Sequence, residues 1–216
     1  MTGVLSSFAH DALLAAAIAG DATIELVPGP GEFVVPGQIL LRVHGELAVD
    51  DATLRRAVDI ADERTIDQDP AFAMRIIVDT SIRALSPAVN DPTTGVQALD
   101  VLEVLVRELA TRDLEASVAR GPDGVVRLAW RSPSWADVLD LAFDEIRYYG
   151  ATSLQITRRL RALLEDVRAS TPPLRHPALD DHLGRLDAAV AAAHAPGSAD
   201  LAVARGADRL GLGLTR

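Results

Sequence analysis

Residues 82–95 read IRALSPAVNDPTTG and mark the point where one apolar helix ends and another begins. Upstream, apolar side chains occupy most of the circumference of the segment from Phe72 to Leu85, which is typical of a buried helix. Asp91 followed by Pro92 has the pattern of an N-cap and a first helical position, so the next helix is predicted to run to about Ala110. Two helices joined by so short a connector are expected to be antiparallel neighbours.

One polar stripe interrupts the first of these helices and continues into the connector. Arg75, Asp79 and Arg83 are four residues apart, so their side chains lie one above another. The two arginines are fixed donors for an anion, and the aspartate can orient them. The stripe therefore predicts a site for a small anionic ligand. Its candidate binding residues are Arg75, Asp79, Arg83, Ser86, Asn90 and Asp91.

Three other interpretations of these residues stay open. Asp91, like Asp69 before Pro70, fits a helix N-cap. Asp79 and Arg83 fit a structural ion pair in an assembly module, because buried charges persist when they are paired. A hydrolase would use Asp79 or Asp91 as a general base, with Arg83 stabilising negative charge.

Composition excludes several kinds of chemistry. The chain has 216 residues, no cysteine, and 21 basic residues that are all arginine. Without lysine or cysteine there is no Schiff base, Walker lysine, thiolate metal site or cysteine nucleophile. Gly211 and Gly213 follow no predicted strand, so a dinucleotide motif is excluded as well. We therefore predict no cofactor.

Charge and hydropathy indicate the surroundings of the chain. The net charge of -10 disfavours nucleic acid as a partner. The longest apolar run, Ala12 to Ala19, is far below the roughly 20 residues needed to cross a bilayer. The N-terminal sequence also lacks the basic cluster of a secretory signal. A cytoplasmic location is predicted, with association with a membrane as the alternative.

The period of the apolar residues predicts an α+β fold dominated by helices. Three parts are expected, at residues 1–50, 51–170 and 171–216. The first combines a helix over Ser7–Ala19 with a small β unit at residues 22–27, 32–35 and 39–43. The second is a helical core, with one helix carrying Leu54 to Ala61 and a hairpin near residues 115–130. The third is an alanine-rich tail with helices over Pro177–His194 and Ser198–Leu212.

Two further clusters have simple interpretations. His176 and His182 lack the spacing of a metal site, so we predict no metal and expect a solvated helix start. Arg158, Arg159 and Arg161 are followed one turn later by acidic residues, which is typical of a solvated face. Binding of this basic run to an anionic membrane surface is the alternative.

The segment from Asp79 to Gly95, together with Gln68-Asp69-Pro70 and GEFVVPGQILLRV at residues 31–43, resembles a bacterial family of predicted membrane proteins, domain of unknown function 2254. The resemblance extends over about residues 10–170. It implies a membrane context and no established activity. We therefore expect a non-catalytic regulatory or ligand-sensing domain, homo-oligomeric, with a membrane protein or the membrane surface as a possible partner.

Overall fold

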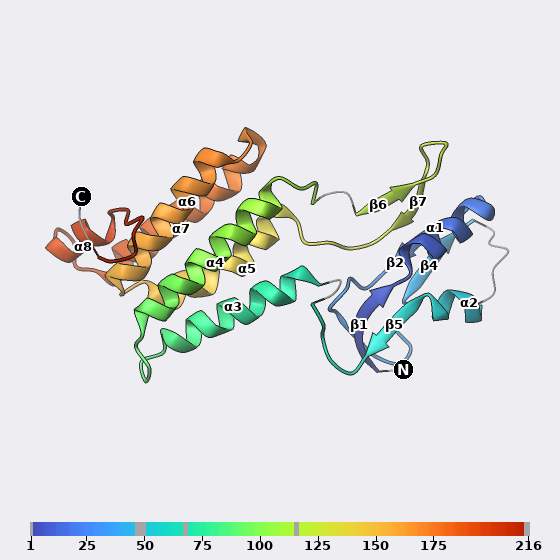
Figure 1. The fold of residues 1–216 in the computed structure, drawn as a ribbon, viewed down its shortest axis with the longest axis horizontal. Helices are drawn as coiled ribbons and strands as arrows, with labels where there is room; N and C mark the ends of the chain where they lie inside the picture. Colours follow the sequence, from blue (N-terminus) through green and yellow to red (C-terminus); the bar gives the residue numbers. More distant parts are fainter. Residues whose placement is uncertain (1, 46–50, 67–68, 115–116, 214–216) are drawn as a thin grey trace. The chain divides into compact units, whose positions relative to one another are not determined.

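The computed structural model describes residues 2–45, 51–66, 69–114 and 117–213. The chain divides into two compact units, one formed by Met1–Phe72 with Leu114–Pro133 and the other by Ala73–Asp113 with Ser134–Arg216. Strands are concentrated in the first unit and long helices in the second (Figure 1). The predicted α+β fold dominated by helices is confirmed.

Among the residues that the structure describes, the first unit contains two small sheets, helices α1 and α2, and the first turn of α3. One sheet has the order β3-β1-β5 and is antiparallel; the other has the order β4-β2-β7-β6, with only the pair of β2 and β7 parallel among the pairs described. In chain order the elements are β1 (Gly3–Phe8), α1 (His10–Ala19), β2 (Thr23–Leu26), β3 (Phe33–Val34), β4 (Leu41–His44), α2 (Asp51–Arg56), β5 (Val58–Ala61), β6 (Val118–Arg120) and β7 (Val126–Ala129).

Two apolar clusters form the core of this unit. Leu13 of α1 packs with Ile24 of β2 and Leu128 of β7, and all three are almost completely buried. The second cluster joins the two sheets, because Leu26 of β2 packs with Leu5 of β1 and Val58 of β5. Since β7 follows the N-terminal strands by about a hundred residues, the predicted hairpin completes a sheet begun at the N-terminus.

Two sequence predictions in this unit are wrong. The helix expected from Ser7 begins at His10, because the residues before it form strand β1. The helix expected to carry Leu54 to Ala61 ends at Arg56, and Val58–Ala61 forms β5 instead. Strands β1 and β5 pair with each other, with Phe8 opposite Val58. Their pairing partners lie some fifty residues apart, so local periodicity did not reveal them.

The second unit is a helical bundle. Helix α4 packs on α6, and α7 packs on both α5 and α6 (Figure 1). Large buried side chains such as Leu99, Phe143, Ile146 and Leu160 form its core. Its elements are α3 (Pro70–Ala84, whose first turn belongs to the other unit), α4 (Pro92–Ala110), α5 (Trp135–Gly150), α6 (Leu154–Ser170), the 3-10 turn η1 (Pro173–Arg175), α7 (His176–Ala193) and α8 (Ala199–Ala204).

The C-terminal segment differs from the prediction in its last helix. Helix α8 ends at Ala204, whereas the apolar pattern predicted a helix to Leu212. After α8, the buried Asp208 carboxylate accepts N–H groups from Leu210, Gly211 and Gly213. These bonds stabilise a compact turn that competes with helix.

Candidate functional site

The α3 stripe is built around a doubly paired arginine. Arg75 donates from Nη1 and Nη2 to the two carboxylate oxygens of Glu145 on α5, over 2.5 and 2.9 Å. Its Nε donates to Asp79 one turn further along α3, over 2.6 Å. The Arg75 hydrogen bond holds the pKa of Glu145 below its usual value. Because two carboxylates already use this guanidinium fork, Arg75 is poorly placed to bind an additional anion.

The remaining predicted site residues make local contacts. The Arg83 side chain is exposed and has no ion-pair partner among the described residues, while its carbonyl accepts the Ser86 hydroxyl over 2.7 Å. Asn90 is exposed and adopts a positive φ of 49°, as a turn residue. Asp91 accepts the Thr94 amide over 3.2 Å and its hydroxyl over 2.6 Å, which lowers the pKa of Asp91. The N-cap interpretation of Asp91 is confirmed, and ligand binding by the stripe stays a prediction.

Two of the three arginines in the α6 run, Arg158 and Arg159, are buried, so the interpretation of this run as a solvated face is wrong for them. Arg159 is only 7% exposed and donates to Asp100 over 2.7 Å and to Glu103 over 2.5 Å, both on α4. Arg158 is 3% exposed. Local sequence does not reveal this pairing, because Arg159 lies more than fifty residues from both acidic partners.

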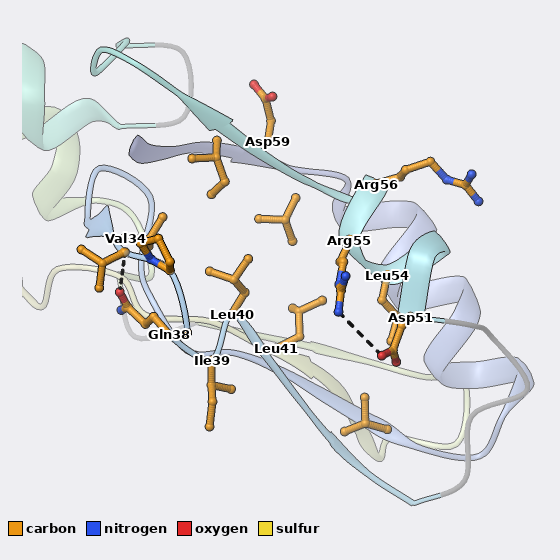
Figure 2. Close-up of a pocket in the computed structure, with 16 residues that line it drawn as sticks. Val34, Gln38, Ile39, Leu40, Leu41, Asp51, Leu54, Arg55, Arg56 and Asp59 are labelled. Atoms are coloured by element: carbon orange, nitrogen blue, oxygen red, sulfur yellow. Dashed lines mark hydrogen bonds and ion pairs between the residues drawn. The ribbon is translucent and has the colours of Figure 1, made fainter. Parts of the chain in front are cut away.

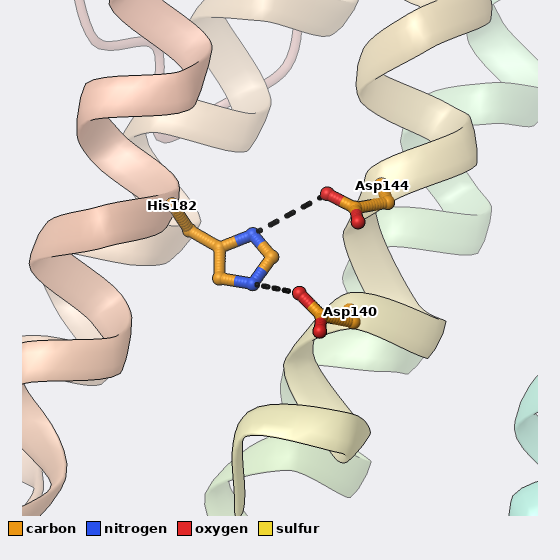
Figure 3. Close-up of side chains that lie close together, drawn as sticks. All are labelled: Asp140, Asp144 and His182. Carbon is orange, nitrogen blue, oxygen red and sulfur yellow. Dashed lines mark ion pairs between the residues drawn. The ribbon is translucent and has the colours of Figure 1, made fainter.

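A second charged cluster joins α5 to α7. His182 on α7 is 2% exposed, which contradicts the solvated helix start expected for it. Its Nε2 lies 3.2 Å from Asp140 and its Nδ1 4.0 Å from Asp144, both on α5 (Figure 3). Arg185 donates to the same two aspartates, over 2.8 Å to Asp140 and 3.3 Å to Asp144. Burial lowers the pKa of His182, which favours the neutral imidazole.

A cavity of about 1000 Å³ opens in the first unit, where the sequence predicted no site. Leu40 faces this space, and Asp51 and Arg55 lie at its α2 end (Figure 2). Ten of its lining residues are aliphatic or proline: Val34, Val35, Pro36, Ile39, Leu40, Leu41, Val43, Leu54, Val58 and Ile60. Several of these apolar side chains are solvent-exposed; Ile39 is 54% exposed.

The polar rim of this cavity carries a weakly held cation. Arg55 lies 3.9 Å from Asp51, and the two side chains are 79% and 89% exposed. An exposed pair at this distance contributes little, so Arg55 can turn to another anion at low cost. Arg56 donates to Thr53 and extends away from the cavity (Figure 2). The cavity thus combines an apolar interior with an available guanidinium. In the sequence, turn residues such as Pro36-Gly37 indicated strands in this region, and no local pattern indicated a cavity.

The chain is similar to known proteins that have no assigned activity. It is 38% identical over 112 residues to uncharacterized proteins of Mycobacterium tuberculosis and Mycobacterium bovis. The matched region is 52% of this chain and 22% of each relative, so the chain spans about a fifth of their length. No solved structure matches it.

The family match covers a larger part of the chain. Among the described residues, no helix is both long and apolar enough to cross a membrane. Residues 1–166 match the model of a family described as predicted membrane protein (DUF2254). This region includes the β unit, the α3 stripe and most of α6. The resemblance inferred from the segment around Asp79 to Gly95 is therefore confirmed, and the chain belongs to the DUF2254 family of predicted membrane proteins.

Proposed function

We propose that this chain is the ligand-sensing region of a membrane protein, with the cavity of the first unit as its binding site. The ligand is an amphipathic anion with an aliphatic body, such as a long-chain carboxylate. The proposal keeps the non-catalytic regulatory function expected from the sequence and places the region on the cytoplasmic side of the membrane. The membrane context is supported by the family description.

The observation that carries the proposal is the size and lining of the cavity. Small-molecule sites are concave, mostly apolar, and about 300–1000 Å³ in volume. The cavity reaches the upper end of this range and has an aliphatic lining. Exposed apolar surface of this extent costs free energy in water, and an aliphatic ligand would remove it from water. An extended hydrocarbon chain suits the cavity better than a compact polar metabolite.

The anionic head group is inferred from the rim. Arg55 stands at the α2 end of the cavity with one long, exposed contact to Asp51. Arg75, which the sequence favoured for an anion, is held by Glu145 and Asp79. A bound carboxylate would replace Asp51 as the partner of Arg55 without leaving a buried charge unpaired. The expected contribution of Arg55 is small, under about 1 kcal/mol, because the rim is open to solvent.

The test uses displacement of the fluorescent dye 8-anilinonaphthalene-1-sulfonate from the whole chain. Laurate should displace the dye in a saturable manner and bind more tightly than dodecylamine, which has the same chain length and the opposite charge. Arg55→Ala should weaken laurate by up to about fivefold. Leu40→Trp, which places a bulkier side chain in the cavity, should weaken displacement by laurate.

The matched control is Val125→Trp. Val125 is 47% exposed in the same unit and does not line the cavity. This variant should bind laurate like the unmodified chain, and circular dichroism should show that both tryptophan variants are folded. Equal loss of binding in both variants, or no saturable displacement by laurate from the unmodified chain, would refute the proposed site.

A structural assembly module is the second candidate, and one surface feature favours it. Val101 and Val104 on α4 are 49% and 67% exposed and lie three residues apart, hence on one helix face. Covering this face in a homo-oligomer would remove it from water. Val104→Glu should then lower the molar mass measured by light scattering. An unmodified chain that is monomeric at all concentrations would exclude this function.

A further inference from the structure

We propose that Asp140, Asp144 and His182 form a binding site for a divalent transition metal ion such as Zn²⁺, between α5 and α7. The three residues each offer one ligand atom, and these atoms all lie within 4.8 Å of one another. The site lies wholly in the helical unit and shares no residue with the proposed ligand cavity, so the two proposals stand or fall separately.

The helices bring the ligands together by simple geometry. Asp140 and Asp144 are four residues apart on α5, so both side chains project from one face of that helix. His182 comes from the facing helix α7, and its ring edge is turned toward the two carboxylates (Figure 3). An edge-on contact with Phe143, with ring centroids 6.1 Å apart, helps to fix the imidazole plane.

The buried imidazole itself points to a missing partner. His182 is 2% exposed, and its Nδ1 makes no hydrogen bond to any of the described residues. A buried polar nitrogen without a partner costs free energy, so such atoms call for an explanation. The carboxylate oxygen of Asp144 lies 4.0 Å from Nδ1, which is too far for a hydrogen bond. Two ligands of one tetrahedral zinc ion are about 3.4 Å apart, so an ion fits here after a small adjustment.

Nε2 of the same ring lies 3.2 Å from the Asp140 carboxylate. One ion binds only one nitrogen of an imidazole, so the Asp140 carboxylate must turn from Nε2 toward the ion when Nδ1 binds it. Burial favours the neutral imidazole, the form that binds metals.

In this structure the guanidinium of Arg185 provides the positive charge beside Asp140 and Asp144, where the metal ion would bind. Its guanidinium contacts Asp140, Asp144 and Asp181, while Arg147 contacts Asp144. Three carboxylates thus face two guanidinium groups, and the cluster has an excess of negative charge. The Arg185 side chain is 39% exposed, so it can swing into solvent when an ion arrives. Metal binding and the Arg185 contacts should therefore compete.

The donor set indicates the class of metal. One imidazole nitrogen with two carboxylate oxygens suits Zn²⁺, Mn²⁺ or Co²⁺ better than Ca²⁺, which prefers six to eight oxygen ligands. Three protein ligands also leave coordination positions open for water or another molecule.

The test is calorimetric titration of the whole chain with Zn²⁺ in a buffer without chelators. One saturable site is expected. Asp144→Asn should weaken it at least about tenfold, and Arg185→Gln should tighten it about fivefold, because the competing cation is lost. The increase in affinity separates a metal site from a merely structural cluster, in which Arg185→Gln would only destabilise the fold.

Two control variants address other zinc ligands on the surface. Asp187→Asn removes an α7 carboxylate that pairs with Arg161, outside the cluster. His176→Gln removes a histidine at the start of the same helix. Both should bind Zn²⁺ like the unmodified chain. The proposal is overturned if neither the unmodified chain nor Arg185→Gln binds Zn²⁺ saturably, or if Asp144→Asn and Asp187→Asn bind it equally well.

Discussion

Two glycine-to-alanine substitutions in the helical unit should change stability in opposite directions. Gly184 is exposed in the middle of α7, and a Cβ built there meets no atom within 4 Å. Alanine is about 0.8–1.0 kcal/mol more favourable than glycine inside a helix. Gly184→Ala should therefore stabilise the protein by about 0.5–1 kcal/mol.

Gly150 has the same secondary structure but different surroundings. It is the last residue of α5, and a Cβ there would lie 2.3 Å from Cγ2 of Ile156 and 3.0 Å from its Cβ. Ile156 is completely buried, and its branched Cβ cannot rotate away. Overpacking of this kind costs about 1–3 kcal/mol, against a helix gain below 1. Gly150→Ala should destabilise the protein by about 1–2 kcal/mol, which places the two variants about 1.5–3 kcal/mol apart.

Urea unfolding followed by far-UV circular dichroism measures both values. The cost of Gly150→Ala should shrink in an Ile156→Ala background, where the clashing Cγ2 is absent. If both substitutions shift the urea midpoint in the same direction by similar amounts, the inference that Gly150 packs closely against Ile156 of α6 is refuted.

Two further outcomes follow from individual contacts. The pKa of Glu145 is lowered in the folded state by its hydrogen bonds to Arg75, so the stability it contributes is present above the ordinary glutamate pKa of about 4.3 and is lost as the pH falls below it. Between about pH 5 and pH 3 the unmodified chain should lose stability more steeply than Glu145→Gln in urea titrations, and equal slopes would contradict this. Ser134 caps α5 by accepting the Asp137 amide in a capping box; Ser134→Ala should cost about 1 kcal/mol, whereas the exposed Ser132→Ala should change the urea midpoint little.

Local signals predicted the long helices well. Helix α4 runs from Pro92 to Ala110, as expected from the Asp91 cap, the following proline and a sustained apolar period. Each of these signals acts within a few residues, so no knowledge of the fold is needed to interpret it. The strands β2, β3 and β4 were found for the same reason, since turn residues separate them.

Contacts between distant residues set the limit of prediction. Val58 fits a helical spacing with Leu54, yet it forms a strand because β1 supplies a pairing edge. Arg159 appears solvated in the sequence, yet it is buried because α4 brings Asp100 and Glu103 to it. His182 likewise depends on α5, about forty residues earlier. These environments are determined by packing between elements, which local periodicity does not describe.

Arg75 and Arg159 are held differently from Arg55 in this lysine-free chain, and the difference guides the search for an anion site. A guanidinium presents several donors in a rigid fork, so one arginine can satisfy two carboxylates, which a lysine does less well. Arg75 and Arg159 are used in this way, each between two acidic side chains. Removing either carboxylate to admit a ligand would break an existing charge pair.

Arg55 has one long, exposed contact with a carboxylate, whereas Arg75 and Arg159 each have two short ones. Its contact with Asp51 is 3.9 Å long and exposed to solvent. Replacing that contact by a ligand carboxylate costs little desolvation, since water already surrounds both groups. The binding free energy must then come mainly from the aliphatic lining beside it, because the charge pair contributes under about 1 kcal/mol. In dye displacement, the affinity of aliphatic ligands should therefore depend more on the length of the aliphatic chain than on the charge of the head group.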